Sequence, residues 1–390
     1  QLGTGHAARV GLEALGERSG TVLIVYGDCP LLTSESLSAL IELRERAGAP
    51  LALWTTRVDE PRGYGRVLRG SDGRPERIVE DRDATPEQRS VTEINPGVYA
   101  ADAAWLRDAL ARLAPNNAQG ELYLTDLVSL ACADGHAAVA LEVGALETVG
   151  VNDRAQLAEA ATALQARVVR CAQLAGVTFV SPTTVVVDAE VRFGTDVTIG
   201  PHAQLTGATA IEGDVQIGAG CVLHDSAVAA GTVVHPYSVC DGAVIAKGCV
   251  VGPFARLRPG AVLEQGAHVG NFVEMKKARL GRGSKANHLA YLGDADIGAK
   301  SNIGAGTITC NYDGVGKHQT VIGDEVFIGS NATLVAPVVI ARGAYVAAGS
   351  TVTADVPEDA LAIGRGRQEN KAGYAVGVRA KNAARAKKKP

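Results

Sequence analysis

A histidine and several cations gather in one short stretch of this chain. Arg258, Lys276 and His288 come first, and Asn311 and Tyr312 follow soon after. Arginine and lysine at this density indicate an anionic ligand, and a sugar phosphate suits them. His288 is the candidate general base, because an imidazole gains and loses a proton near neutral pH. A solvated surface position is the alternative for any one of these residues, but their coincidence favours a site.

A second candidate site lies near the start of the chain. Residues 21–26 are typical of a buried strand, and Gly27 and Asp28 follow them. Ligands of open α/β sheets bind at the carboxyl ends of strands, so Asp28 could hold a divalent metal on a nucleotide phosphate. Taken alone, an aspartate after a strand is commonly a turn residue.

The element that positions the first group follows from a repeat of six residues. Aliphatic residues recur at that interval, with Gly, Ala, Ser, Asp and Asn between them. A helix needs a period near 3.6 and an ordinary strand one near 2, so the pattern indicates a parallel β-helix whose aliphatic residues point into a narrow prism. A run of hairpins is the alternative, but it would not hold register over so many repeats. The expected inward positions are Ile199, Leu205, Ile211, Ile217 and Leu223, then Val233, Val239, Ile245, Val251, Leu257, Leu263 and Val269, and finally Ile322, Ile328, Leu334, Ile340, Val346 and Val352.

The length of the repeat sets the size of the β-helix. It runs from about residue 183 to 356, which at 18 residues per coil predicts about nine or ten coils and a length of roughly 45 Å. Residues 309–320 interrupt the repeat, and we expect a protruding loop there. Long loops on a regular scaffold usually carry function.

Residues 1–152 alternate strand-like and helix-like runs, which predicts an α/β domain around a mostly parallel sheet. We expect helices at 34–46, with Ser34 as a possible N-cap, and at 105–113, and a strand at 51–56. Residues 153–173 carry helical periodicity. The predicted segments are an α/β domain at 1–152, a linker helix at 153–175, a β-helix at 176–356 and a basic tail at 357–390.

Composition and charge narrow the class of protein. Aromatic residues make up 4% of the chain and hydrophobic residues 46%, which suits a thin prism of aliphatic side chains. Residues 365–390 hold nine Lys or Arg and one acid, so the other residues carry a net charge of −12, which argues against a nucleic-acid partner. The seven cysteines show no CxxC pair and no companion histidine spacing, so we expect reduced thiols in the cytoplasm. We predict no membrane span, and no signal peptide is visible, although the chain begins at Gln1 without a Met.

Several weak motifs of the first 152 residues become specific through their order. They are Gln1-Leu2-Gly3-Thr4-Gly5-His6, Tyr26-Gly27-Asp28, Gly63-Tyr64-Gly65-Arg66, Ile78-Val79-Glu80, Glu93-Ile94-Asn95, Asn116-Asn117-Ala118-Gln119-Gly120-Glu121 and Gly150-Val151-Asn152. Together they resemble the N-terminal half of the bacterial bifunctional N-acetylglucosamine-1-phosphate uridylyltransferase/glucosamine-1-phosphate N-acetyltransferase family. The resemblance implies that Asp28 and Asn152 hold Mg²⁺, that Gly3 and Thr4 contact uracil, and that Gly65, Glu80 and Asn95 bind the amino sugar. The whole implied UDP-N-acetylglucosamine site is Gly3, Thr4, Tyr26, Gly27, Asp28, Gly65, Glu80, Asn95 and Asn152.

The repeat region is similar to the same family, without a gap from Pro253 to Asp324. The motifs are Arg256-Leu257-Arg258-Pro259, Asn271-Phe272-Val273-Glu274-Met275-Lys276-Lys277, Asn287-His288-Leu289-Ala290-Tyr291-Leu292-Gly293-Asp294 and residues 305–314. The resemblance implies an incomplete, Rossmann-like α/β nucleotidyltransferase domain, a left-handed parallel β-helix of hexapeptide repeats, and a homotrimer with sites between subunits. Glucosamine 1-phosphate would contact Arg258, Lys276, Tyr291 and Asn302. Acetyl-CoA would contact Ala305, Asn311, Tyr312, Ser330, Ala348 and Arg365, with Asn311 and Tyr312 also positioning the sugar.

The implied chemistry is direct transfer of acetyl from acetyl-CoA to the sugar amine. That amine attacks only when neutral, so His288 would take its proton, and a backbone N–H or the Ser330 hydroxyl would stabilise the oxyanion. The family opens with a glycine-rich phosphate loop, and about 75–80 residues that carry it would precede Gln1. We therefore expect the intact protein to use UTP as well, giving UDP-N-acetylglucosamine for peptidoglycan and lipopolysaccharide precursors, and uridylyl transfer by this chain to be weak.

Other hypotheses stay open at this point. Cys310 could be a covalent nucleophile, although no base is paired with it in sequence. The β-helix could be a non-catalytic scaffold, but structural solenoids show uniform faces and not one zone of histidine and cations. The enzyme could also be limited to nucleotidyl transfer. Most of the basic tail is expected to be disordered, while its first part could contact the CoA phosphates.

Overall fold

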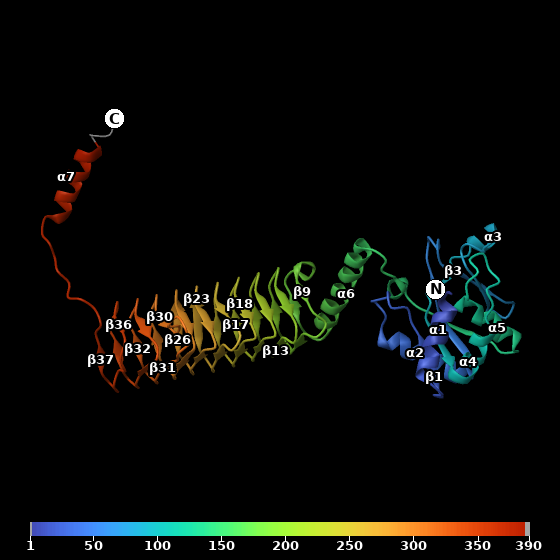
Figure 1. Ribbon diagram of the computed structural model, residues 1–390, viewed down its shortest axis with the longest axis horizontal. Helices are drawn as coiled ribbons and strands as arrows, with labels where there is room; N and C mark the ends of the chain where they lie inside the picture. Colours follow the sequence, from blue (N-terminus) through green and yellow to red (C-terminus); the bar gives the residue numbers. More distant parts are fainter. Residues whose placement is uncertain (1, 387–390) are drawn as a thin grey trace. The chain divides into compact units, whose positions relative to one another are not determined.

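The computed structural model describes residues 2–386, and Gln1 and residues 387–390 lie outside that range. The chain forms two compact units, residues 1–164 and 165–390. Figure 1 shows the first as a mixed α/β body, drawn mainly in blue and teal, and the second as a stack of coils from green to red. Within the described range, no helix is both long and apolar enough to cross a membrane.

The first unit is built on one sheet with helices on both faces. Its elements are α1 Thr4–Leu15, β1 Thr21–Ile24, α2 Ser34–Ala47, β2 Leu51–Arg57, β3 Gly65–Arg69, β4 Pro75–Val79, α3 Pro86–Arg89, β5 Glu93–Asn95, β6 Tyr99–Asp102, α4 Ala103–Arg112, α5 Leu127–Ala133, β7 Val139–Glu142 and the start of α6 Arg154–Leu174. The strand order is β1-β6-β2-β5-β3-β4, with β7 beside β2. On β2, Leu53 lies in one core cluster with Leu106 of α4, and Trp54 lies in another with Leu40 of α2. The alternation of side chains along β2 therefore buries both of its faces.

The sheet is mostly antiparallel, so the predicted mostly parallel sheet is wrong. Among the described residues 2–164, only the pair of β2 with β7 is parallel, and the pairs β1–β6, β2–β6, β2–β5, β3–β5 and β3–β4 are antiparallel. Parallel strands need a crossover connection of a dozen or more residues. The short link between β3 and β4 cannot supply one, and this distinction is lost in a count of strand-like and helix-like runs.

Local boundaries in this unit also differ from the predictions. The expected strand at 21–26 ends at Ile24 and is only half-buried, because β1 lies at an edge of the sheet. Helix α2 is capped by Thr33, whose hydroxyl accepts a hydrogen bond from the Ser36 amide at 3.2 Å, so Ser34 is its first residue and not its cap. Helix α4 begins two residues earlier than expected, because the Asp102 carboxylate caps it.

The second unit is a parallel β-helix with three faces, as the repeat predicts. Between residues 178 and 362, all of which are described, parallel sheets of eleven, ten and nine strands stack with one strand per coil. Inward aliphatic side chains form one continuous core from Val177 to Val356. At the first coil, Val169 of α6 joins this core, and the Gln165 amide exchanges hydrogen bonds of 2.6 and 2.9 Å with the Val187 backbone.

Each face is named by its number of strands. The eleven-stranded face holds β8 Thr178–Phe179, β11 Thr198–Ile199, β14 Gln216–Ile217, β17 Val233–Val234, β20 Val250–Val251, β23 His268–Asn271, β26 Lys285–His288, β29 Asn302–Ile303, β32 Phe327–Ile328, β35 Tyr345–Val346 and β37 Leu361–Ala362. The ten-stranded face holds β9 Val186–Val187, β12 Gln204–Thr206, β15 Val222–His224, β18 Val239–Asp241, β21 Arg256–Leu257, β24 Glu274–Lys276, β27 Tyr291–Gly293, β30 Ile308–Cys310, β33 Thr333–Val335 and β36 Thr351–Val352. The nine-stranded face holds β10 Arg192–Phe193, β13 Ala210–Ile211, β16 Ala227–Val228, β19 Val244–Ile245, β22 Val262–Leu263, β25 Arg279–Leu280, β28 Ala295–Ile297, β31 Thr320–Ile322 and β34 Val338–Ile340.

The coils are not uniform, since some hold 17 residues and others 18. Leu223, for example, pairs with Cys240 in the next coil. A strict count of six therefore loses phase: Val234 and Cys240 are fully buried, whereas Val239 is 39% exposed. The predicted inward positions Val233 and Val239 are wrong, because a coil of 17 residues shortens one side by a residue.

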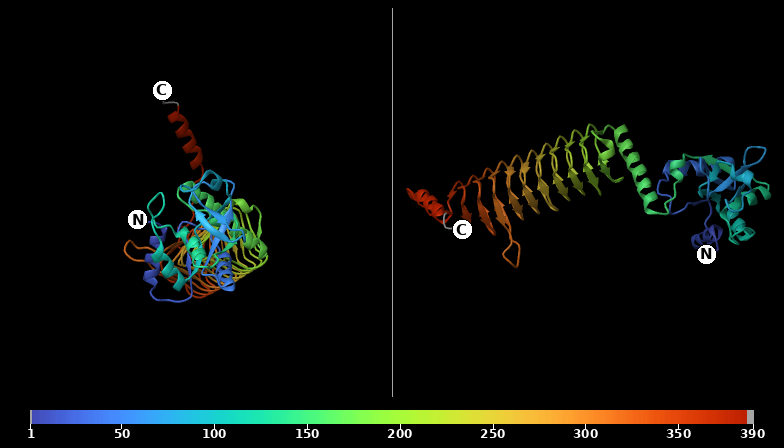
Figure 2. Two further views of the ribbon diagram at one scale, coloured as in Figure 1. Left: turned by 90° about the vertical axis from the view of Figure 1, so that its right-hand side faces the viewer. Right: turned by 90° about the horizontal axis from the view of Figure 1, so that it is seen from above.

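Two segments depart from the stack of coils. Residues 311–319 leave it between β30 and β31, which confirms the predicted loop, and Figure 2 shows this loop projecting in orange. Most of the tail is expected to be disordered, yet Tyr374–Ala386 forms helix α7 with every side chain exposed. The alanine-rich sequence of α7 has high helix propensity, which the charge of the tail conceals.

Candidate functional site

One edge of the β-helix carries four of the predicted site residues. It joins the eleven-stranded to the ten-stranded face, and from Phe272 to Gly349 a residue with positive φ turns the chain there in every coil. Successive coils are bonded at this edge: the Gly306 amide donates to the His288 carbonyl at 3.4 Å, and the Asn331 amide donates to the Ala305 carbonyl at 2.7 Å. The residues just before the turn, which we call the edge column, are Asn271, His288, Ala305, Ser330 and Ala348. The predicted base thus lies in line with three predicted acetyl-CoA residues.

His288 is exposed at the end of β26, and Asn271 stands beside it one coil earlier. Its Nδ1 lies 3.0 Å from Asn271 Oδ1. A carbonyl oxygen only accepts hydrogen bonds, so Nδ1 carries the proton and Nε2 keeps its lone pair. Within residues 2–386, Nε2 has no hydrogen-bond partner. The ring is therefore arranged as a general base.

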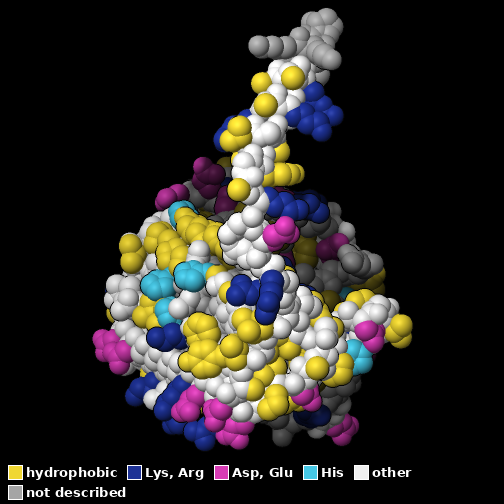
Figure 3. All heavy atoms as spheres, turned by 90° about the vertical axis from the view of Figure 1, so that its left-hand side faces the viewer, with side chains coloured by type: hydrophobic (Ala, Val, Ile, Leu, Met, Phe, Trp, Pro, Cys, Tyr) yellow, Lys and Arg dark blue, Asp and Glu magenta, His cyan; other side chains and the backbone are white. Residues whose placement is uncertain are grey.

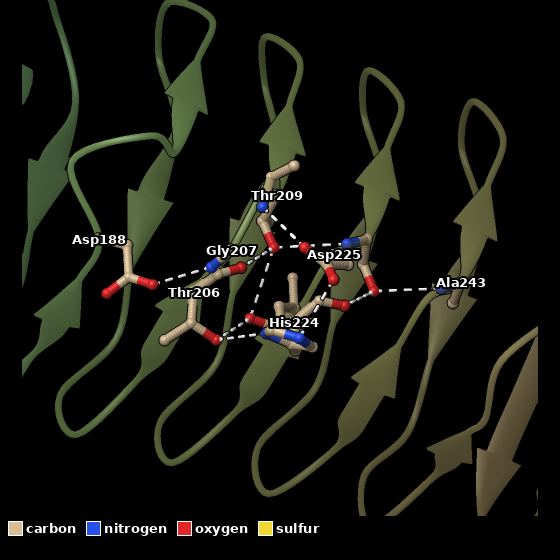
Figure 4. A network of polar contacts seen from close by, with 10 residues as sticks. Asp188, Thr206, Gly207, Thr209, His224, Asp225 and Ala243 are labelled. Atoms are coloured by element: carbon tan, nitrogen blue, oxygen red, sulfur yellow. Dashed lines mark hydrogen bonds and ion pairs between the residues drawn. The ribbon is translucent and has the colours of Figure 1, made fainter.

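His224 shows the contrasting arrangement of a structural histidine in the same fold. Its Nδ1 lies 3.0 Å from Thr206 Oγ1, and its Nε2 lies 3.1 Å from Asp225 Oδ2 (Figure 4). Both ring nitrogens of His224 are engaged, so neither is available to a ligand. Only one nitrogen of His288 is engaged in this way.

Three cations meet at the opposite end of the ten-stranded face. Lys276 ends β24, Arg258 follows β21, and Lys317 comes from the projecting loop. The contact with Lys317 and then the charges of Lys317 and Arg258 lower the pKa of Lys276, while Asp294 opposes them. Such mutual repulsion is relieved when a phosphate binds.

Tyr291 lies between the edge column and the cations. It pairs in register with Glu274, whose Oε1 accepts an ion-pair hydrogen bond from Arg258 Nη1 at 2.8 Å. A side chain at position 293 would collide with the Tyr291 hydroxyl, so Gly293 makes room for it. The hydroxyl group therefore lies close to the backbone, on the side where the cations gather.

The projecting loop is held by its own polar contacts. The Asp313 carboxylate accepts hydrogen bonds from the Gly316 amide at 2.7 Å and from His318 Nε2 at 2.7 Å. These contacts hold the pKa of Asp313 well below its usual range. At the base of the loop, the Asn311 side-chain amide donates to the Asp294 carboxylate. This order gives Lys317 a defined place beside Lys276.

The other residues predicted for this site lie further apart. Asn302 is half-buried on the eleven-stranded face, one coil from Lys285. Tyr312 is exposed in the loop, and its hydroxyl donates to the Gly314 carbonyl at 2.7 Å. Arg365 is exposed beyond the last strand. One subunit therefore does not gather these three around His288.

The sequence analysis assigned no role to Asn271, Lys317 or Asp294. A signal for two of them exists in the chain, because residues 17 apart occupy the same place in successive coils of this region. Asn271 and His288 are so related, and so are Asp294 and Asn311. Lys317 has no such signal, since it lies in an irregular loop.

In the first unit, a pocket of about 450 Å³ opens beside the turn after β1. Among the residues lining it are Tyr26, Asp28, Asn95 and Asn152. The Val151 amide donates to the Asp28 carbonyl at 2.9 Å, which joins the turn to the segment that holds Asn152. The pocket thus brings together four predicted residues from distant parts of the chain.

Asp28 and Asn152 supply oxygen atoms of the kind that hard cations prefer. Among the described residues, no group of three His, Cys, Asp or Glu side chains could enclose a metal ion. A divalent cation held by these two residues would take its remaining ligands from phosphate and water, as Mg²⁺ commonly does. The donor set therefore fits an ion that arrives with a nucleotide.

The Tyr26 ring lies directly over Gly97, where φ is +85° and any Cβ would collide with the ring. Burial, followed by the nearby charges of Glu80 and Asp28, raises the pKa of Tyr26 to about 12. Its hydroxyl stays protonated at neutral pH and is hydrogen-bonded to the Thr4 side chain. Tyr26 therefore connects the start of α1 with the pocket.

The remaining predicted residues surround this region. Burial raises the pKa of the Glu80 carboxyl, and Gly65 packs against it so closely that a Cβ there would lie 3.5 Å from Glu80 Oε1. Asn95 is buried, and its Oδ1 accepts a hydrogen bond from the Tyr99 hydroxyl at 2.6 Å. Gly3, with φ of 98°, stands at the start of α1, and Gly27 lies in the turn before Asp28.

Family models match both units. The model described as nucleotidyl transferase matches residues 1–149. The model described as GMPPB C-terminal domain matches residues 179–280, and the one described as bacterial transferase hexapeptide (six repeats) matches residues 319–354. These matches support a nucleotidyltransferase domain followed by a left-handed β-helix of hexapeptide repeats.

Relatives match almost the whole chain. The bifunctional protein GlmU of Trichlorobacter lovleyi is 48% identical over 382 residues, covering 96% of this chain and 82% of that protein. The bifunctional protein GlmU of Stutzerimonas stutzeri is 50% identical, with the same two coverages. That of Sorangium cellulosum is 50% identical over 391 residues and covers 100% of this chain and 82% of its own length. Identity at this level across both units shows that the chain belongs to the GlmU family of bifunctional proteins.

Proposed function

We propose that the β-helix acetylates the amine of glucosamine 1-phosphate with acetyl-CoA. The observation that carries this proposal is that a histidine with a free Nε2 and a group of three cations border one face. Lys276, Lys317 and Arg258 bind the phosphate, and Tyr291 holds the sugar between them and His288. His288 Nε2 takes a proton from the amine as the nitrogen attacks the thioester carbon. The tetrahedral intermediate then expels the CoA thiolate, which receives that proton.

Acetyl-CoA binds along the edge column on the far side of His288. Ala305, Ser330 and Ala348 follow one another there with small side chains, which leave backbone groups within reach of a long, thin ligand. The Ser330 hydroxyl or a backbone N–H stabilises the oxyanion. Asn311 and Tyr312 hold the sugar, and Arg365 binds the phosphates of CoA.

A covalent cysteine route is disfavoured by position. Cys310 ends β30, four residues beyond Gly306, whose amide bonds to the His288 carbonyl. At about 3.3 Å per residue the two side chains are separated by about 13 Å along the face. A nucleophilic cysteine needs a base within hydrogen-bond reach.

Replacing His288 tests this proposal. We expect His288→Ala to lower kcat for acetyl transfer by about 10²–10⁴ and to change KM for both substrates far less, because the imidazole moves a proton and does not bind the ligand. Raising the pH should partly restore the rate, since more amine is then neutral. Cys310→Ala should stay within a few-fold of wild type. A near-normal kcat for His288→Ala together with an inactive Cys310→Ala would overturn the mechanism.

We further infer that the pocket of the first unit binds UTP and UDP-N-acetylglucosamine with Mg²⁺. Its support is the meeting of Asp28 and Asn152 at one pocket with Tyr26 and Asn95. When bound, the ion neutralises charge on the phosphates. Asp28 and Asn152 hold it, and Asn95, with Glu80 and Gly65 close by, contacts the amino sugar. Calorimetric titration of UDP-N-acetylglucosamine should show binding that weakens when Mg²⁺ is removed and in Asp28→Asn.

We also infer that the protein is a cytoplasmic homotrimer. All seven cysteines are free thiols, which suits a reducing compartment. Beside the edge column lies an exposed row of large apolar side chains, Tyr237, Phe254, Phe272 and Leu289, whose rings stack at 5.3 and 5.4 Å. All four have positive φ, which bulky residues rarely adopt. A second subunit that covers this row would also border His288.

A further inference from the structure

We propose that Asn271 is a positioning residue for acetyl transfer, which holds His288 so that Nε2 faces the substrate amine. The proposal rests on the role of His288 as the base and deepens it. Asn271 Oδ1 accepts the Nδ1 proton of His288 at 3.0 Å, and no other protein group in residues 2–386 orients this ring. Without that contact, the neutral imidazole exchanges its proton between both nitrogens, and only part of the enzyme presents a free Nε2.

The backbone keeps the two side chains at a fixed separation. Asn271 and His288 are register partners on β23 and β26, and the Leu289 amide donates to the Asn271 carbonyl at 3.1 Å. One residue earlier, Gly270 approaches the Asn287 carbonyl so closely that a Cβ at position 270 would collide with it. The coils are therefore pressed together where the side-chain contact forms, and the amide can be replaced without moving the strand that carries it.

The choice of an amide has an electrostatic consequence. The titratable groups on the strands around His288 are His268 on β23, Lys285 on β26 and Glu274 on β24, and β29 brings none. Burial and then the charge of Lys285 lower the pKa of His268. Asn271 orients the ring without adding charge, whereas a carboxylate in its place would stabilise the protonated imidazole and hold the base inactive to higher pH.

Two substitutions of this residue separate positioning from structure. Asn271→Ala should lower kcat by about 10–100-fold with KM within a few-fold, which is the usual effect of losing an orienting partner. Asn271→Asp keeps an acceptor of the same shape, so it should restore most of kcat at high pH. It should also move the acidic limb of the pH profile of kcat upward by about 1 pH unit or more.

The matched control removes the same kind of contact from a histidine outside the site. Thr206→Ala deletes the hydroxyl beside Nδ1 of His224 and should leave both kcat and the pH profile unchanged. All variants are measured as the full chain, with thermal unfolding midpoints alongside, and the isosteric Asn271→Asp provides the test if Asn271→Ala does not fold. A wild-type profile for Asn271→Ala would overturn the proposal, as would an unshifted acidic limb in a folded Asn271→Asp. Failure of the base itself is distinguishable, because His288→Ala would then be active.

Discussion

The cations that meet at the end of β24 account for a specific kinetic effect. We expect Lys276→Ala and Lys317→Ala each to raise KM for glucosamine 1-phosphate by about tenfold or more, with a much smaller change in kcat. The reason is that a phosphate is bound equally in the ground state and the transition state, so its loss removes uniform binding. Steady-state kinetics against the sugar phosphate measure the effect, and KM for acetyl-CoA is the internal reference.

A neighbouring lysine provides the control for this prediction. Lys277 is exposed at the corner beyond β24, and the cation group does not include it. Lys277→Ala should therefore leave KM unchanged. A fall in kcat at constant KM in Lys276→Ala would assign that lysine to the chemical step and contradict its role as a phosphate ligand.

The residues of the candidate site were predictable to different degrees. His288, Lys276 and Arg258 could be identified from the sequence because their side chains carry chemistry by themselves. Asn271 could not, because its importance depends on a neighbour one coil away, and coils of 17 and 18 residues pair different residues. A side chain that acts through another is visible only when the register is known.

Among the elements of the first unit, the turn between β5 and β6 supports the nucleotide pocket. Gly97→Ala would force a Cβ into the Tyr26 ring at a backbone angle that alanine disfavours. We expect it to lower the free energy of unfolding by about 1–3 kcal/mol and to weaken UDP-N-acetylglucosamine binding. Chemical denaturation and calorimetry measure the two effects separately.

Gly73→Ala is the control for this change. Gly73 also has positive φ, but a Cβ there would meet nothing within 4 Å. It should lose stability through backbone strain alone and keep nucleotide binding. Equal losses of binding in both variants would show that Tyr26 has no part in the pocket.

The elements also show what a periodic pattern can and cannot predict. A repeat of six dictated the β-helix, because no other element places an aliphatic residue inward at that interval. The direction of strand pairing in the first unit was missed, since β3, β4 and β5 are joined without long crossovers. Pairing direction depends on connections and on distant partners, and strand-like composition contains neither.

At the scale of the whole molecule, the apolar row on the β-helix edge should hold the subunits together. Phe254 and Phe272 are exposed and stacked at 5.4 Å, so Phe254→Ser with Phe272→Ser should weaken the trimer and lower acetyl transfer with it. Light scattering across a concentration series measures the oligomer. Figure 3 shows hydrophobic and histidine side chains gathered on the face seen from the C-terminal end of the β-helix.

Val244→Ser is the control, because Val244 is an equally exposed apolar residue on the nine-stranded face. It should leave the oligomer intact. A wild-type chain that is a stable and active monomer would refute the trimer, and a trimer that survives both phenylalanine substitutions would move the interface elsewhere.

The edge column behaves as a ruler graduated in coils. From His288 through Ala305 and Ser330 to Ala348 it takes three steps, about 14 Å at about 4.8 Å per step. The loop at 311–319 can lengthen or shorten without altering this scale, because its insertion leaves the stacking of β30 on β33 in register. A ligand laid along the edge is therefore measured in whole coils. Substrate preference at the sugar end can drift by single residues, while the reach required of the acyl carrier can change only by one complete turn.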